Sequence, residues 1–217
     1  PAATIAATNV QAAIEEVVSD LAASTGAGLV GYLPGATGAV ATDIQSKLRE
    51  GFISITDFYA NGVSGPKVDP TGVIDSTVGI QAAANYCETN WRTLFIPTPS
   101  VAYKISATIR LACSTIGEVP QGSTYPGQFL CTSEFTAFVL VGSRLEFKNL
   151  GVHFSLGASA TSAVGFSFAD TITQFSNNLC SHLYVRHAFR SYACNASGSI
   201  GTLWNNTFIN CRSDLQS

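Results

Sequence analysis

The chain has 217 residues, of which 46% are hydrophobic and only 12% are charged, with a formal net charge of −3. This charged share is about half of that in ordinary soluble domains, which indicates much buried surface or a large oligomer interface. The 11 Lys and Arg residues do not cluster, so nucleic-acid binding has no electrostatic footprint. No apolar run reaches the roughly 20 residues that a membrane helix needs, and we expect no membrane insertion.

The sequence contains no methionine, and its N-terminus lacks the basic and apolar regions of a signal peptide. We therefore expect the chain to be part of a longer protein. Six cysteines are present, but no two form a Cys-x-x-Cys pair, so the sequence predicts neither a metal site nor a cofactor. Cysteine packs as a small apolar residue in protein cores. We expect free buried thiols, with disulfides as the alternative.

Residues 8–21 have the pattern of a helix. Thr8 and Gln11 have the spacing of a capping box. The apolar positions that follow are four, three and four residues apart and form a seam of about two heptads: Val10, Ile14, Val17 and Leu21. So short a helix is marginal alone in water, and β-branched residues along the seam favour a trimer. The alternative is a helix that packs on its own chain.

A glycine-rich linker follows at residues 24–38. Its segment 26–31 formally matches G-x-G-x-x-G, but a dinucleotide site needs a strand before the motif and a helix opening within it, so we reject that reading. Residues 42–49 repeat the capping pattern and predict a short helix, whereas residues 53–58 alternate as a strand does. After a loop at 61–77, residues 78–87 predict a second helix with one apolar face.

Short apolar runs separated by Gly, Ser, Asn and Thr dominate the chain from residue 93 onward. Residues 179–185 overlay residues 204–210 at an offset of 25, and residues 145–152 are a looser third copy. Repeat periods of 20–50 residues indicate a solenoid, so strands one coil apart should pair in parallel. Leu183 and Val185 should then lie near Phe208 and Asn210. A β-sandwich is the alternative fold.

The segment Gly31–Glu50, followed by Ile53–Phe58, Ile80–Ala83 and Thr93–Pro97, resembles the N-terminal part of bacteriophage tailspike or tail fibre proteins of the pectate-lyase-like β-helix superfamily. The resemblance covers roughly residues 25–110. It implies a mainly β chain, with an α-helical stalk and Gly-rich linker at 1–50 and the opening coils of a right-handed parallel β-helix at 51–217. In this family a helix, here near 76–88, covers the open end of the first coil, whose strand edge would otherwise be unpaired.

The resemblance also implies a homotrimer that is assembled in the cytoplasm of the bacterial host and located in the virion tail. Its partners would be phage tail, baseplate or adaptor proteins and bacterial surface polysaccharide. Many members of the family cleave that polysaccharide. Two alternatives stay open: part of a polysaccharide depolymerase, hydrolase or lyase, with its site in or after these coils, and a purely structural virion fibre. A secreted bacterial adhesin would need a signal peptide.

Glycan hydrolysis needs two carboxylates held at a set separation. Few acids follow residue 93: Glu118, Glu134, Glu146, Asp170 and Asp214. Glu146 and Asp170 are 24 residues apart, about one coil, and are the pair to consider, although solvated surface residues explain them equally simply. We assign no catalytic residue, and we expect this chain alone to leave capsular or O-antigen polysaccharide uncut.

Three further groups have alternative readings. His182 and His187 lie near Arg186 and suggest a lyase or metal site, but their i, i+5 spacing on a strand would separate the rings, so we interpret them as surface or turn residues. Asn205, Asn206 and Asn210 are interpreted as partners of turn backbone groups and not as glycosylation sites. Several phenylalanines could stack on sugars, but they alternate with small residues and predict interior stacking: Phe135, Phe138, Phe154, Phe166, Phe168 and Phe175.

Overall fold

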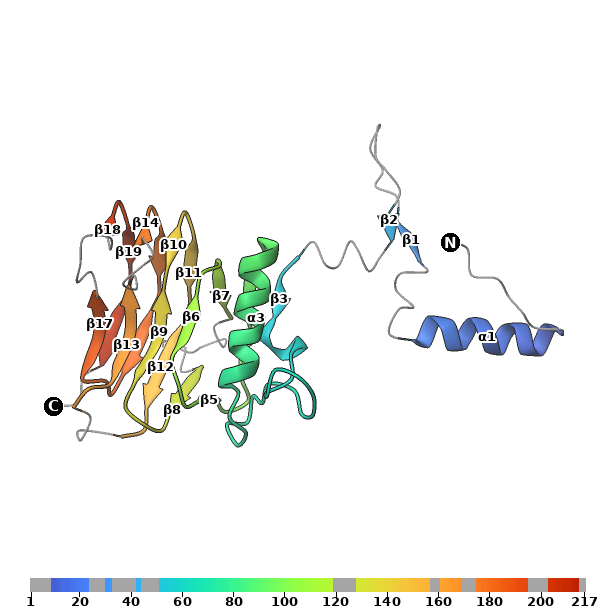
Figure 1. Ribbon diagram of the computed structural model, residues 1–217, viewed down its shortest axis with the longest axis horizontal. Coiled ribbons are helices and arrows are strands. Elements are labelled where there is room, and N and C mark those ends of the chain that lie inside the picture. The colour runs from blue at the N-terminus through green and yellow to red at the C-terminus, as the bar shows by residue number, and fades with distance from the viewer. Residues whose placement is uncertain are drawn as a thin grey trace. The chain divides into compact units, whose positions relative to one another are not determined.

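The computed structural model describes residues 9–23, 30–32, 42–43, 51–118, 128–156, 161–168, 175–194 and 203–214. The chain divides into two compact units, residues 1–51 and 52–217. The first unit contains helix α1 (Val10–Ala22) and the antiparallel strands β1 (Gly31–Tyr32) and β2 (Thr42–Asp43) (Figure 1). The glycines at 26 and 28, which belong to the rejected dinucleotide motif, lie outside the described residues.

Helix α1 begins after Asn9, whose side-chain oxygen accepts a hydrogen bond from the backbone N–H of Ala12 at 2.9 Å. Asparagine is among the preferred N-cap residues, so the cap is Asn9; Thr8, which the sequence predicted, lies outside the described residues. None of the helical residues is buried within the described structure. The large apolar side chains of α1 are all exposed: Val10, Ile14, Val17, Val18 and Leu21.

The helix predicted over 42–49 is wrong at its start. Thr42 and Asp43 form strand β2 and lie opposite Tyr32 and Gly31 of β1 in an antiparallel pair. Threonine is β-branched and fits a strand better than a helix, and the pairing with β1 satisfies backbone groups that a helix would otherwise use. Residues 44–50 lie outside the described part of the chain.

The second unit is a stack of short strands that all pair in parallel. The strands form sheets of six (β19-β15-β11-β7-β4-β3), five (β20-β16-β12-β8-β5), four (β17-β13-β9-β6) and three strands (β10-β14-β18). Each coil contributes one strand to each sheet in turn, which is the organisation of a parallel β-helix. The parallel pairing predicted from the sequence is therefore confirmed, and a β-sandwich is excluded because its sheets are antiparallel.

The strand bounds of the first coils are β3 (Ile53–Ser54), β4 (Leu94–Ile96), β5 (Tyr103–Ile105), β6 (Ile109–Leu111), β7 (Thr115–Gly117), β8 (Phe129–Cys131), β9 (Thr136–Leu140) and β10 (Gly142–Ser143). Those of the later coils are β11 (Glu146–Lys148), β12 (Gly151–Phe154), β13 (Val164–Phe168), β14 (Phe175–Ser176), β15 (Leu179–Ser181), β16 (Tyr184–Arg186), β17 (Arg190–Cys194), β18 (Leu203–Trp204), β19 (Thr207–Ile209) and β20 (Arg212–Asp214).

The strand predicted over 53–58 is shorter than expected. Only Ile53–Ser54 is a strand, and residues 55–57 form the 3₁₀ turn η2. The backbone N–H of Ser54 donates to the Asp57 carboxylate at 3.1 Å, and the Ser54 hydroxyl accepts from the N–H of Thr56 at 3.2 Å. This reciprocal capping box starts the turn and overrides the alternating pattern.

The predicted repeat offset of 25 residues is wrong. Cys180 lies opposite Phe208, an offset of 28, and Val185 lies opposite Ser213 and not near Phe208. Phe147 lies opposite Cys180, an offset of 33. Coils differ in length because the loops between strands differ, so a single sequence period cannot describe them.

The corners between the six-stranded and five-stranded sheets fix the register. Asn149, His182 and Asn210 occupy this position in successive coils, each with a positive φ of 56°, 54° and 51°. Asparagine adopts this left-handed conformation more readily than most residues. The Asn149 N–H donates to Ser181 O at 3.0 Å, and the His182 N–H donates to Ile209 O at 2.9 Å, so the corners also stack by hydrogen bonds.

Aromatic side chains fill the interior of the coils. Phe166 stacks between Phe138 and Tyr192, with ring centroids 5.7 and 6.1 Å apart. The predicted interior position is confirmed for the buried phenylalanines Phe138, Phe154, Phe166, Phe168 and Phe175, and Phe135 packs partly buried against Phe154. The expected free thiols are likewise found at every cysteine whose side chain is described: Cys87, Cys113, Cys131, Cys180 and Cys211.

A buried asparagine network joins neighbouring coils. Asn178 is 2% exposed. Its side chain accepts from the N–H of Leu145 at 2.8 Å and donates to Gly142 O at 3.1 Å. Its own backbone N–H donates to the side chain of Asn206 at 3.0 Å, and Asn206 donates to Phe175 O at 2.9 Å. The interpretation of Asn206 as a partner of turn backbone groups is therefore confirmed.

We expect Asn178→Ala to lower the free energy of unfolding by about 2 kcal/mol or more, because it leaves two buried backbone groups unpaired at about 1–3 kcal/mol each. Equilibrium urea denaturation measures the loss. The control is Asn90→Ala, which removes one exposed hydrogen bond to Tyr86 O and should cost less than half as much. Equal losses in the two variants would contradict the assignment.

Candidate functional site

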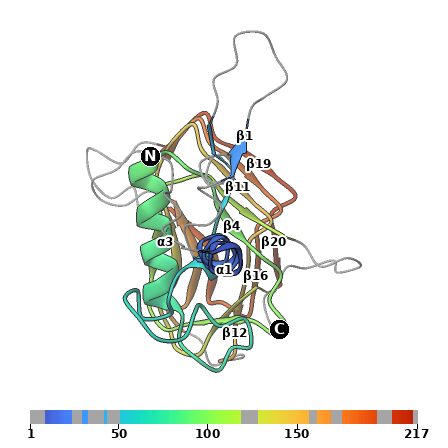
Figure 2. The same ribbon diagram turned by 90° about the vertical axis from the view of Figure 1, so that its right-hand side faces the viewer.

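Helix α3 (Thr77–Asn90) covers the start of the coil stack and confirms the helix predicted over 78–87. Its buried face carries Ile80, Ala83, Ala84 and Cys87, and these residues belong to the core that the coils share. Figures 1 and 2 show α3 lying along one side of the first coils, next to β6. The helix therefore takes the place of a preceding strand in the four-stranded sheet.

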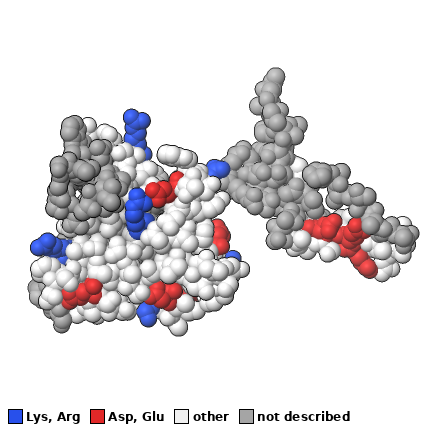
Figure 3. Space-filling model, in the orientation of Figure 1, with Lys and Arg blue, Asp and Glu red and all other residues white. Residues whose placement is uncertain are grey.

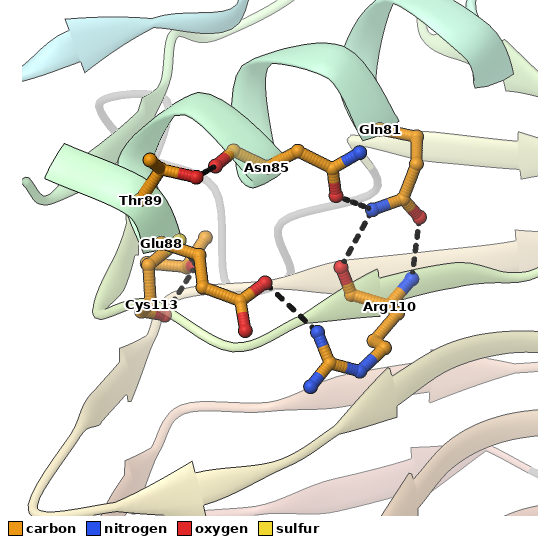
Figure 4. Close-up of polar contacts among 7 residues, drawn as sticks. Gln81, Asn85, Glu88, Thr89, Arg110 and Cys113 are labelled. Carbon is orange, nitrogen blue, oxygen red and sulfur yellow. Dashed lines mark hydrogen bonds and ion pairs between the residues drawn. The ribbon is translucent and has the colours of Figure 1, made fainter. Parts of the chain in front are cut away.

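Gln81 pairs with the otherwise free edge of β6. Its side-chain oxygen accepts from the backbone N–H of Arg110 at 2.8 Å, and its side-chain nitrogen donates to Arg110 O at 3.1 Å (Figure 4). The same nitrogen donates to Asn85 at 2.8 Å. The amide of one side chain thus replaces the peptide group of a neighbouring strand. Thr77 adds a similar contact, because its hydroxyl accepts from the N–H of Ser106 at 2.8 Å.

An ion pair lies beside this contact. The Arg110 guanidinium donates to the carboxylate of Glu88 at 2.8 Å (Figure 4). Both side chains are more than a third exposed, and exposed ion pairs contribute at most about 1 kcal/mol to stability. The pair therefore matters less for folding than for the surface that it presents.

Trp91 ends α3 in an unusual way. It is the C-terminal cap, with φ 54° and ψ 43°, and its indole is 93% exposed. Glycine is the usual residue at such a left-handed position, and other residues cost roughly 1–2 kcal/mol there. The next residue, Arg92, closes the helix end by donating its N–H to Cys87 O at 2.9 Å. The indole is therefore held at a fixed place on the surface.

A groove of about 450 Å³ opens beside Trp91, within the range of about 300–1,000 Å³ that is typical of small-ligand sites. The end of α3 contributes Glu88, Trp91 and Arg92, and the first coil contributes Arg110 and Ser114. Ser143, from the second coil, completes the polar lining. The groove is thus built from the end of α3 and two successive coils.

Serine hydroxyls extend the polar surface toward the later coils. The hydroxyls of Ser143 and Ser176 are 2.7 Å apart on adjacent strands of the three-stranded sheet. The Ser114 hydroxyl accepts from the N–H of Glu146 at 3.1 Å. Cys87 and Cys113, both buried, line the base of the groove. A hydrogen bond to Cys113, together with burial, raises the pKa of the Cys87 thiol, so this thiol stays protonated near neutral pH.

The two predicted histidines occupy separate turns. His182 has φ 54° and lies 3.3 Å from the Asn210 side chain, whereas His187 has φ 59° and lies 3.3 Å from His153. The interpretation as turn residues is confirmed, but the premise that both stand on one strand is wrong. His153, on β12, was missed by the sequence reasoning. Burial, followed by the charges of His187 and Arg186, lowers the pKa of His153.

The predicted carboxylate pair is not brought together by the coil period. Glu146 lies opposite Leu179 in the next coil, and Asp170 lies outside the described residues. Glu118 accepts from the N–H of Thr98 at 2.9 Å. Glu134 accepts from Ser162 and Thr161, and these hydrogen bonds lower its pKa. The strand β20 carries Asp214.

The described ranges contain no group of three or more His, Cys, Asp or Glu residues that could hold a metal ion. They also contain no helix with the length and apolar character required to cross a membrane. On the face of the second unit drawn in Figure 3, charged side chains are few and scattered. A ligand of this surface would therefore meet hydroxyl, aromatic and isolated charged groups.

One acidic residue organises the loop that precedes α3. The Asp69 carboxylate accepts from the N–H groups of Thr71, Val73 and Ile74 and from the Thr71 hydroxyl, at 2.7–3.0 Å. The hydrogen bond from Ile74, followed by those from Thr71, lowers the pKa of Asp69 to about 2. A single carboxylate therefore orders the long loop at 61–77.

This shift predicts a pH dependence of stability. Because the folded pKa is below the unfolded value of 3.8, the Asp69 carboxylate stabilises the fold fully above about pH 4 and loses this effect as the pH falls through about 2. We expect Asp69→Asn to flatten the decline of Tm in that window, measured by thermal unfolding at a series of pH values. Asp20→Asn, on α1, is the control. A slope unchanged by Asp69→Asn would contradict the assignment.

No protein-family model matches the chain, and no curated protein matches it. Solved structures of the tailspike protein of E. coli bacteriophage HK620 are similar in fold. A mutant in complex with pentasaccharide has a TM-score of 0.55 at 17% identity, and a double mutant in complex with pentasaccharide has 0.56 at 18%. The wild-type tailspike in complex with pentasaccharide has 0.51 at 18%.

In each case the match covers 94% of this chain and 42% of the tailspike. This chain has the fold of a phage tailspike. The tailspike-like order of linker, capping helix and parallel coils expected from the sequence is therefore confirmed at the level of the fold. The match spans less than half of each tailspike, and the identity is low, so it carries the architecture and not the activity.

Proposed function

We propose that the chain is part of a phage tailspike that binds bacterial surface polysaccharide and attaches to the virion tail. The observation that carries the proposal is the fold match, over 94% of the chain, to a tailspike protein in complex with a pentasaccharide. A groove with an exposed indole, paired charges and hydroxyls lies on the coils and is suited to a polar ligand. Free thiols at the described cysteines agree with assembly in a reducing bacterial cytoplasm.

We further propose that the protein is a homotrimer assembled through α1. The seam residues Val10, Ile14, Val17 and Leu21 are exposed in the single chain, and Val18 widens the apolar stripe. A stripe of this kind on a short helix needs a partner surface, because such helices are marginal alone in water. Its own copies provide a matching surface around a threefold axis. Residues 1–50 would then form the virion-proximal end.

The experiment uses the purified chain and a panel of bacterial capsular and O-antigen polysaccharides. We expect binding to at least one polysaccharide, measured by biolayer interferometry, and no release of reducing sugar. Binding with release of oligosaccharides would instead support a depolymerase. Binding to none of the panel, together with retention on phage tails, would support a purely structural fibre and overturn the polysaccharide proposal.

A further inference from the structure

We propose that the groove beside Trp91 binds an acidic oligosaccharide, with the indole stacked on a pyranose ring and Arg92 paired with a sugar carboxylate. This inference rests on the proposed polysaccharide binding and assigns it to a place on the capping helix. The site lies where α3 ends against the first two coils, and every residue used below belongs to the second unit.

The position of Trp91 is the first argument. Packing does not account for the indole, because 93% of its surface is exposed. Helix capping does not account for it either, since glycine fits φ 54° better. A residue that costs stability at its position and gains no contact in the chain is expected where function needs it. A rigid exposed indole offers an apolar plate with a polar edge, which suits the C–H face of a pyranose ring.

The charges of the groove are the second argument. Arg110 donates to Glu88, whereas Arg92 has no ion-pair partner among the residues that the structure describes. The groove therefore has one cationic group in excess. Guanidinium groups bind carboxylates through paired, charge-assisted hydrogen bonds that are stronger than neutral ones. An acidic sugar complements this arrangement better than a neutral one.

The shape of the groove is the third argument. Its base is apolar, and the hydroxyls of Ser143 and Ser176 continue from it along successive coils. A chain of sugars can follow this line, with its ring faces on Trp91 and its hydroxyl groups on the serines. The centre of an interface between proteins is instead depleted in charged groups. A second copy of this chain is therefore the less suitable occupant.

The test compares a carboxylate-bearing capsular polysaccharide that the chain binds with the same polysaccharide after its carboxylates are reduced to alcohols. We expect reduction to weaken binding by about tenfold or more, because a charge-assisted contact is lost. Arg92→Gln should weaken binding to the acidic form by a similar factor and should make binding insensitive to the reduction. Biolayer interferometry on the full chain gives both affinities.

Trp91→Gly separates binding from folding. Glycine suits the left-handed cap, so this variant should keep or raise Tm while its affinity falls about tenfold or more. Phe189→Ala and Arg190→Gln change an exposed aromatic residue and an exposed cation elsewhere, and they should leave binding unchanged.

Other outcomes separate the two proposals. If the chain binds only neutral polysaccharides, or if Trp91→Gly and Arg92→Gln bind as the unchanged protein does, the groove assignment is overturned while polysaccharide binding stands. A change of oligomeric mass in Trp91→Gly would show that the indole belongs to an interface between copies and would also overturn it. If the chain binds no polysaccharide at all, the proposed function itself fails.

Discussion

Phe138→Ala is expected to lower the free energy of unfolding by about 3–5 kcal/mol, the range for deleting a fully buried aromatic side chain. Phe138 is buried between Phe129, at 4.8 Å in an edge arrangement, and Phe166, at 5.7 Å in a stack. Removing it leaves a cavity between coils and breaks the stack that Phe166 continues to Tyr192. Equilibrium denaturation in urea measures the change from the midpoint and the slope.

Phe189→Ala is the matched control, because this side chain is half exposed and should cost well below 1 kcal/mol, as surface substitutions generally do. Phe138→Leu keeps most of the volume and should fall between the two. If Phe138→Ala cost no more than the control, the aromatic stack would not be what holds adjacent coils together.

Ile14→Asp is expected to convert the proposed trimer into single chains. The substitution places a carboxylate in the middle of the α1 seam, where three copies would have to bury three like charges close together, and such burial costs several kcal/mol per ion. Light scattering coupled to size-exclusion chromatography reads the mass directly. The folded second unit should keep its circular dichroism spectrum, because α1 belongs to a separate compact unit.

Ser19→Asp introduces the same charge on the same helix, five residues away and off the seam, and should leave the mass unchanged. A monomeric unchanged protein would refute the trimer at once. An Ile14→Asp variant that stays trimeric would show that residues other than the α1 seam hold the copies together.

Features that depend on local pattern and burial were predictable from the sequence. The apolar face of α3 and the interior aromatic residues follow from spacing, and parallel pairing follows from the presence of repeats. The register did not follow, because the loops between strands differ in length and the offset changes from 33 to 28 between coils. The stronger signal was a residue that tolerates positive φ before an apolar residue, as at Asn149, His182 and Asn210.

Two local predictions failed because a contact outweighed the pattern. Side-chain capping by Ser54 and Asp57 turned an alternating segment into the 3₁₀ turn η2, and pairing with β1 drew Thr42 into a strand. The groove was not predicted at all, since it joins the end of α3 to strands of two later coils. Its one sequence signal was Trp91 directly after the helix, at a position where glycine is usual.

Gln81 gives the coil stack a definite beginning. In a one-dimensional array each layer is a template for the next, so an uncovered first layer would accept a strand from any other molecule and allow end-to-end growth. Because both backbone groups of Arg110 on that edge are already bound by one amide, addition of a foreign strand would have to displace a contact within the same chain. Copies of this protein can therefore associate side by side, about a common axis, without polymerising through this end.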